Sequence, residues 1–167
     1  MPQVFIQPSY GTPDARRYGA ESLEKTVDFC AYAELLDPAD LTRLSALHPG
    51  GRARFWGAKD KYDRRMDTLA TGDVVLFTGR KHVQATAEVG HGFRNPAFAR
   101  RLWQPDPGKC LFSNVYSLRR YRHVGMPYEA IWALPGFTAG DNFMGLRFLD
   151  EAKSAAVVAL LRDQAAG

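Results

Sequence analysis

Short apolar runs alternate with helical segments along the chain, and this order predicts an α+β fold. Five or six runs have strand-like composition, and helical segments follow the first of them and recur at intervals. We therefore expect a curled, mostly antiparallel β-sheet or barrel with peripheral helices. At 167 residues the chain suits a single domain, residues 1–167, with room for a hydrophobic core.

The first half of the chain is expected to form two strands separated by helices. Residues 4–7 are an apolar run that ends at a turn rich in proline and glycine, as a strand does. Apolar residues recur with helical spacing over residues 21–36, which predicts an amphipathic helix. The Asp-Pro pair at 37–38 is typical of a helix start, and this second helix should stop at Pro49. A strand around Trp56 follows.

The second half is expected to contribute a hairpin, two further strands and several helices. The hairpin should turn around the Gly-Arg-Lys sequence at 79–81. The expected elements are a short helix or ordered loop at 59–70, strands at 73–79 and 82–90, a helix at 95–103, a strand or bent strand pair at 110–122, a helix at 127–134, a strand at 144–149 and a closing helix at 150–163.

Positive charge is concentrated in the middle of the chain. Residues 52–122 contain fifteen Lys or Arg and six Asp or Glu, a balance of +9, whereas the remaining residues carry a balance of −5. A basic block between acidic flanks indicates that one part of the fold meets an anionic partner, and nucleic acid is the favoured one. An arginine-rich solvated surface is the alternative.

Other features of the composition restrict the class of protein. The N-terminal residues lack the charged and apolar regions of a signal peptide, and no apolar run has the length of a membrane span. Cys30 and Cys110 are too few and too far apart for a disulfide framework or a zinc site. The four histidines show no metal-binding spacing. We therefore expect a cytoplasmic protein that uses no cofactor and no metal.

Trp56 is the candidate site residue that the sequence marks most clearly. It lies in the run Arg-Ala-Arg-Phe-Trp-Gly-Ala at residues 52–58, in which basic and aromatic residues alternate. An aromatic ring can stack on a base while neighbouring arginines hold phosphate. A position in the hydrophobic core is the other interpretation of the same residue.

The order of these segments resembles the PUA-like superfamily, in particular its EVE and YTH branches. Residues 5–10, Phe-Ile-Gln-Pro-Ser-Tyr, are similar to the first YTH strand and its turn, and residues 55–58 to the strand that carries a cage tryptophan. Residues 74–77 and 85–89 resemble the central hairpin of those domains. Residues 95–103, which end in Leu-Trp before a strand, resemble an EVE-like pattern. The matching segments cover most of the chain.

The resemblance implies a non-catalytic reader that holds one modified nucleobase in an aromatic cage. EVE-like members include N-terminal modules of McrBC-type restriction systems, which recognise methylated bases flipped from DNA, whereas YTH members bind methylated adenine in RNA. The Leu-Trp pair at 102–103 and the long helical insertion at 21–48 favour methylated double-stranded DNA, with 5-methylcytosine as the expected base. The chain would then be a complete domain or a module of a longer restriction protein, with a GTPase or nuclease as effector.

The resemblance places the candidate base pocket around Trp56. The YTH loop that carries a second cage tryptophan corresponds here to Pro-Asp-Pro-Gly at 105–108, so Trp103, Phe112 or Phe143 would supply the opposing wall. The candidate pocket residues are Trp56, Tyr10, Ser9, Trp103, Phe77, Asp141, Asn142 and Phe143. The candidate phosphate contacts are Arg52, Arg54, Lys59, Lys61, Arg64, Arg65, Arg80 and Lys81.

Polar residues are needed in such a pocket, since the methyl group of a modified base contributes only about 0.8 kcal/mol on burial. Discrimination among bases requires groups that pair with the polar edge of the base. Ser9, Tyr10, Asp141 and Asn142 are the candidates, and Asp141 could accept from an exocyclic amine. Ordinary turn chemistry after Gly140 is the alternative for Asp141 and Asn142.

Two other functions remain open from the sequence. A small hydrolase or nuclease similar to the ASCH branch would need a lysine and a hydroxyl residue that face one cleft, and Lys59, Lys61 and Thr78 are the candidates. Serine-hydrolase, phosphate-loop and zinc-deaminase signatures are absent from the sequence. The third possibility is an accessory domain that binds RNA or tRNA.

Overall fold

The computed structural model describes residues 2–109 and 111–167. The strands are β1 (Val4–Pro8), β2 (Val27–Asp28), β3 (Arg52–Ala58), β4 (Val74–Gly79), β5 (His82–Arg94), β6 (Asn114–Pro127) and β7 (Arg147–Phe148). The helices are α1 (Pro13–Ser22), α2 (Pro38–Leu47), α3 (Asp63–Met66), α4 (Pro96–Trp103), α5 (Tyr128–Trp132) and α6 (Glu151–Ala166), and the 3₁₀ segments are η1 (Phe29–Leu35) and η2 (Asp60–Tyr62).

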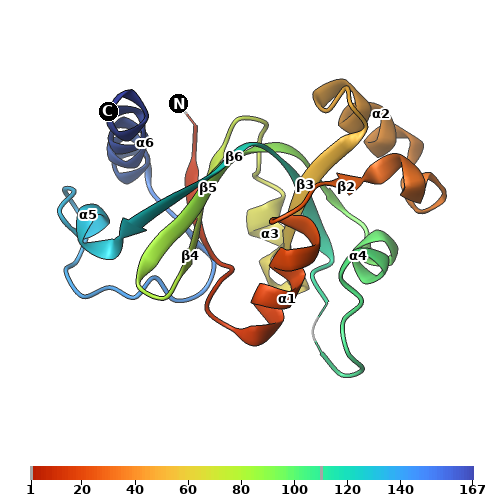
Figure 1. The fold of residues 1–167 in the computed structure, drawn as a ribbon, viewed down its shortest axis with the longest axis horizontal. Coiled ribbons are helices and arrows are strands. Elements are labelled where there is room, and N and C mark those ends of the chain that lie inside the picture. Colours follow the sequence, from red (N-terminus) through yellow and green to blue (C-terminus); the bar gives the residue numbers. More distant parts are fainter. Residues whose placement is uncertain (1, 110) are drawn as a thin grey trace.

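The strands form one sheet in the order β2-β3-β6-β5-β4-β1-β7. Pairing is antiparallel throughout except between β1 and β4, which run parallel, so the expected α+β fold with a mostly antiparallel sheet is confirmed. The helices α5 and α6 lie at one end of this sheet, and α2 and α4 lie at the other (Figure 1).

The sheet is curled but does not close into a barrel, because β2 and β7 remain as edges. The long strands β5 and β6 change register at three places, and Arg120 in β6 has a φ of 53°. Such irregularities bend a strand pair and increase its twist. The bend brings β1 close to β3, although β6, β5 and β4 lie between them in the sheet order. The Gln7 side chain bridges the gap by donating to the Gly57 carbonyl at 3.0 Å.

The first strand is buried on both faces and separates two hydrophobic clusters. Phe5 belongs to the larger cluster, which also holds Trp56, and packs edge-to-face on Tyr116. Val4 and Ile6 belong to the second cluster, to which α5 and α6 contribute apolar residues. Alternate residues of a strand point to opposite faces, so a short apolar run with no polar alternation fits this position.

The predicted helix at 21–36 is wrong. The helix α1 begins earlier, where Thr12 accepts from the Ala15 N–H and Pro13 occupies the first turn. After α1 the chain forms β2, where Val27 pairs with Ala53, and then the 3₁₀ segment η1, which Asp28 caps. The apolar residues do recur with helical spacing, but pairing with β3 outweighs that local preference.

Most of the other predicted elements are confirmed. Asp37 caps α2 through the Ala39 N–H, and the β4–β5 hairpin turns through Arg80 and Lys81, whose φ values are 53° and 61°. The predicted strand at 144–149 is reduced to the two residues of β7. The strand expected at 110–122 runs from 114 to 127 instead, and Cys110 lies outside the described residues. No helix within the described residues is both long enough and apolar enough to cross a membrane.

Candidate functional site

A cavity of about 450 Å³ opens where β1 and β3 end, next to the start of α1. We call it the Trp56 cavity. Its lining combines aromatic rings, one side-chain amide and several lysines. The lining residues are Gln7, Pro8, Thr12, Asp14, Ala15, Tyr18, Trp56, Gly57, Ala58, Lys59, Lys61, Tyr62, Lys109, Phe112, Gly145 and Leu146.

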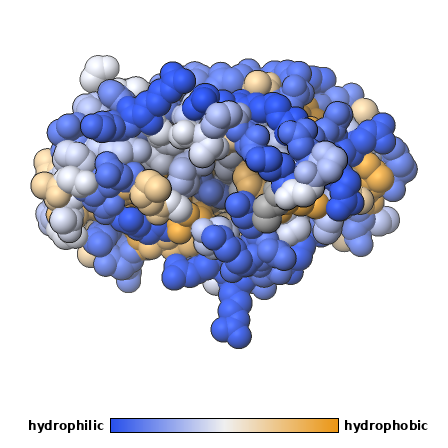
Figure 2. All heavy atoms as spheres, turned by 90° about the horizontal axis from the view of Figure 1, so that it is seen from below, coloured by the Kyte–Doolittle hydropathy of each residue, from blue (hydrophilic) through white to orange (hydrophobic). Residues whose placement is uncertain are grey.

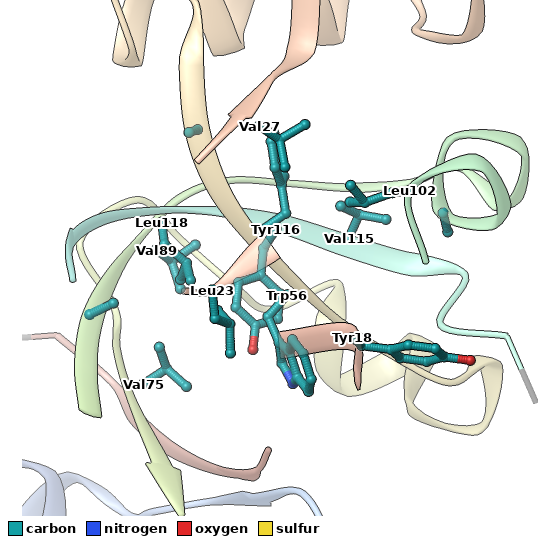
Figure 3. Close-up of a cluster of buried hydrophobic side chains, with 14 of the residues drawn as sticks. Tyr18, Leu23, Val27, Trp56, Val75, Val89, Leu102, Val115, Tyr116 and Leu118 are labelled. Atoms are coloured by element: carbon teal, nitrogen blue, oxygen red, sulfur yellow. The ribbon is translucent and has the colours of Figure 1, made fainter. Parts of the chain in front are cut away.

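Trp56 is both a core residue and a lining residue of this cavity. Only 1% of its surface is exposed, and its ring packs edge-to-face on Phe77 at 6.2 Å, Trp103 at 6.2 Å and Phe112 at 5.5 Å. Figure 3 shows its indole beneath β6, with Tyr116 above it and Tyr18 beside it. The core interpretation of Trp56 is therefore correct, and the ring also borders an open cavity. It offers little free surface for stacking in this conformation.

Tyr18 and Phe112 supply aromatic surface on the same cavity. Their rings meet at 90° with centroids 5.4 Å apart. Burial raises the pKa of the Tyr18 phenol, so the side chain stays uncharged at neutral pH. Phe112, which the sequence had offered as one of three opposing walls, is partly exposed and is the one of the three that lines the cavity.

Gln7 is the buried polar side chain of the cavity. Its amide nitrogen donates to the Gly57 carbonyl at 3.0 Å and to the Tyr116 hydroxyl at 3.2 Å. Burial raises the pKa of Tyr116 well above its ordinary value, so this hydroxyl remains protonated. Both amide hydrogens are thus used within the protein, which leaves the amide oxygen as the group through which this lining residue can accept a hydrogen bond.

Gly57 allows the elements around the cavity to approach one another. A Cβ atom at this position would lie 2.3 Å from the Asn114 carbonyl oxygen, 2.9 Å from the Trp103 ring and 3.1 Å from Phe112. The first of these contacts involves backbone, which cannot move aside. Any side chain at position 57 would therefore push β3 away from β6 or displace the cavity wall.

Positive charge surrounds the opening. Lys59, Lys61 and Lys109 line the cavity, and Lys109 lies 3.6 Å from Asp14 in a half-exposed ion pair. The Lys61 ammonium lies 5.0 Å from the centroid of the Tyr62 ring. Seen from the side on which α1 lies in Figure 1, hydrophilic residues cover most of the surface, with hydrophobic patches between them (Figure 2).

Four of the predicted pocket residues lie behind or beside the cavity rather than in its lining. Phe77 is fully buried against Trp56. Trp103 is buried and its indole N–H donates to Ser22. Ser9 is buried, while the Tyr10 hydroxyl is bonded to Tyr121 at 2.7 Å and to Glu24 at 2.8 Å.

Asp141, Asn142 and Phe143 form a turn outside the cavity. The Asp141 carboxylate accepts from the Phe143 N–H and from Arg147, and the bond to Arg147 lowers the pKa of Asp141. Phe143 is buried in the second cluster, where its ring meets Tyr128 at 4.8 Å. The structure therefore shows the turn chemistry that was the alternative for Asp141, while Gly145 and Leu146 of the same loop do line the cavity.

The predicted phosphate contacts divide into three groups. Lys59 and Lys61 line the cavity, and Arg64 and Arg65 are exposed on α3, which follows η2 directly. Arg52 and Arg54 are used within the protein instead. Arg52 donates to Thr26, and Arg54 donates to the Leu23 carbonyl while its guanidinium lies over Tyr121 at 4.8 Å. Arg80 and Lys81 form the β4–β5 turn and are absent from the lining.

Sequence reasoning missed Gln7, Tyr18 and Lys109. Gln7 carried a usable signal, because it is the only polar side chain in an otherwise apolar strand. Tyr18 was missed because the sequence predicted no helix over most of Pro13–Ser22, where α1 lies. Lys109 directly follows the Pro-Asp-Pro-Gly sequence at 105–108, and no sequence pattern distinguishes it from the other lysines.

The residues proposed for an enzyme are not brought together. Thr78 is buried in β4 and does not line the cavity that Lys59 and Lys61 border. Across residues 2–109 and 111–167, no group of three or more His, Cys, Asp or Glu side chains is placed to hold a metal ion.

The site and sheet together define an α+β domain with an aromatic cavity at the ends of two strands. Neither a scan against protein-family models nor a search of curated proteins finds a match. Among solved structures, the chain is similar to the N-terminal domain of Thermococcus gammatolerans McrB bound to m5C DNA, with a TM-score of 0.65. The two chains are 17% identical, and the similarity covers 96% of this chain and 98% of the other. The chain thus has the fold of that McrB domain, in agreement with the fold class that the sequence predicted.

Proposed function

We propose that the protein is a non-catalytic module that binds DNA carrying a modified base and holds that base, flipped from the duplex, in the Trp56 cavity. The observation that carries the proposal is the aromatic cavity itself, in a domain whose whole length shares the fold of a domain bound to m5C DNA. The expected base is 5-methylcytosine.

The cavity has the properties that a flipped base requires. Its volume of about 450 Å³ is in the range of small-molecule sites, which are mostly apolar with a few placed polar groups. Extraction of a base costs a few kcal/mol, and stacking on aromatic side chains returns roughly 1–3 kcal/mol per base. Phe112 presents a partly exposed ring for such contact, and Tyr18 and Trp56, both buried, line the cavity beside it.

Gln7 provides the polar group that discrimination needs. The exocyclic amine of cytosine is a donor, and the free amide oxygen of Gln7 is an acceptor at the cavity edge. A base with an acceptor at that position would leave the amide oxygen facing another oxygen. This role replaces the one that the sequence suggested for Asp141, whose carboxylate is already bonded.

Phosphate contacts would supply the rest of the affinity. Lys59, Lys61 and Lys109 surround the opening, and Arg64 and Arg65 extend the basic surface along α3. Neutralised phosphates release counterions, so binding should weaken steeply as salt rises. In the cell, such a module would direct an effector, a GTPase or nuclease domain or subunit, to methylated DNA.

Fluorescence-anisotropy titrations with two duplexes that differ only in one 5-methylcytosine test the proposal. Phe112→Ala should weaken binding of the methylated duplex by roughly tenfold, since one stacking surface is lost. Tyr32→Ala is the matched control, because Tyr32 is also a partly buried aromatic residue but packs on Phe98. Trp56→Ala is a poor probe, since truncation of a buried tryptophan costs about 3–5 kcal/mol of stability.

Equal binding of both duplexes by the intact protein would refute a modified-DNA reader. Tighter binding of an RNA with methylated adenine than of every DNA would favour the YTH-like function. Cleavage of an oligonucleotide, lost in Lys59→Ala, would favour an enzyme.

A further inference from the structure

Met144 is the one large apolar side chain that lies mostly in solvent within the described residues, with 79% of its surface exposed. The two residues that follow it, Gly145 and Leu146, line the Trp56 cavity. Consecutive Cα atoms are about 3.8 Å apart, so Met144 stands at the rim of that cavity. A single exposed apolar side chain is not unusual in itself, but its place beside the cavity sets this one apart.

The loop around Met144 is fixed on both sides. Phe143 is buried in the second cluster with a φ of 51°, and its N–H donates to Asp141. On the other side, Gly145 has a φ of 72° and Leu146 packs against the larger cluster. Phe143 and Leu146 are thus packed against the protein, while Met144 between them projects from the surface.

We infer that Met144 inserts into the duplex and fills the space left in the base stack when the modified base enters the cavity. This inference rests on the proposed function, since it requires a flipped base. Proteins that distort DNA commonly insert an apolar side chain, methionine among them, between base steps. An unbranched thioether side chain adapts to an irregular gap, and burial between bases would remove its exposed apolar surface from water.

The test compares a duplex with a single strand, both carrying one 5-methylcytosine. A single strand has no paired stack to fill, so insertion contributes only to duplex binding. Met144→Ala should weaken binding of the methylated duplex about tenfold and leave binding of the methylated single strand unchanged. Met144→Leu should restore most of the duplex affinity. Lys61→Ala is the contrasting variant, because loss of a phosphate contact should weaken both ligands.

The outcomes separate this inference from the proposed function. If the intact protein prefers the methylated duplex and Met144→Ala keeps full duplex affinity, insertion is wrong and the reader function stands. If the intact protein prefers neither methylated ligand over its unmethylated form, both fail together. Equal weakening of duplex and single strand by Met144→Ala would also overturn insertion. Thermal unfolding of Met144→Ala should match that of the intact protein, given the exposure of the side chain.

Discussion

The side-chain amide of Gln7 on β1 donates to the backbone carbonyl of Gly57 on β3, at 3.0 Å. In the sheet order these strands are separated by β4, β5 and β6, so the bond spans the open side of the curl. Both residues line the Trp56 cavity. A contact that joins two strands far apart in the sheet order therefore also shapes the candidate binding site.

Replacement of Gln7 should affect stability and recognition together. Gln7→Leu leaves the Gly57 carbonyl and the Tyr116 hydroxyl without their donor, which should cost about 1–3 kcal/mol in the free energy of unfolding. Chemical denaturation measures this loss. Gln84→Leu is the control, because the Gln84 amide donates to the Gly79 carbonyl away from the cavity. Both variants should lose stability, but only Gln7→Leu should weaken binding of the methylated duplex.

Gly57→Ala should destabilise the protein and distort the cavity. The new Cβ would lie 2.3 Å from the Asn114 carbonyl oxygen, so strands β3 and β6 must separate, at a cost of about 1–3 kcal/mol or more. Gly92→Ala in β5 is the matched control, since the nearest atom to its Cβ is 3.8 Å away. Similar unfolding free energies for the two variants would contradict the close packing described for Gly57.

The salt dependence of DNA binding should show whether the lysines at the cavity opening contact phosphate. If Lys61 contacts phosphate, Lys61→Ala should reduce the slope of log affinity against log salt concentration by about one. Titrations at three or more salt concentrations measure the slope. Lys25→Ala is the control, because Lys25 forms an exposed ion pair with Glu21 and does not line the cavity. An unchanged slope in Lys61→Ala would place that lysine outside the DNA contact.

His48 should make stability depend on pH. Its ring is buried and bonded to Ser117 at 2.8 Å, and burial, together with the nearby Arg119 charge, lowers its pKa below the ordinary 6.5. At a pH between the lowered pKa of His48 in the folded protein and its ordinary pKa in the unfolded chain, the unfolded chain binds more protons than the folded protein. The free energy of unfolding should therefore fall as pH drops below about 6.5. Thermal unfolding from pH 7.5 to 5 should show this decrease, and His48→Gln should show a smaller one.

The sequence predicted the sheet better than the helical insertion. The Trp56 strand, the β4–β5 hairpin and the Asp37 cap depend on local signals, such as alternation and capping residues, and all three are present in the structure. Val27, by contrast, belongs to a helical pattern in the sequence but pairs with Ala53 in the structure. That pairing depends on a strand 26 residues away, which a periodic pattern cannot reveal.

The sequence predicted only part of the candidate site, because some of its residues meet through contacts between distant segments. Trp56 is marked by its own sequence run, and Lys59 and Lys61 follow it directly, so all three were identified. Tyr18 and Phe112 meet at the cavity only because α1 packs beside β3 and the chain before β6 returns to it. The Asp141 carboxylate could accept a hydrogen bond from a base, but in the structure it accepts one from Arg147.

A crystal structure of the protein with a duplex that carries one 5-methylcytosine tests the central claim most directly. Our account predicts that the methylated base is rotated out of the helix and lies in the Trp56 cavity, against Tyr18 and Phe112, with its amine facing Gln7. A methylated base that stays stacked in the duplex, or one bound elsewhere while this cavity stays empty, would contradict the account.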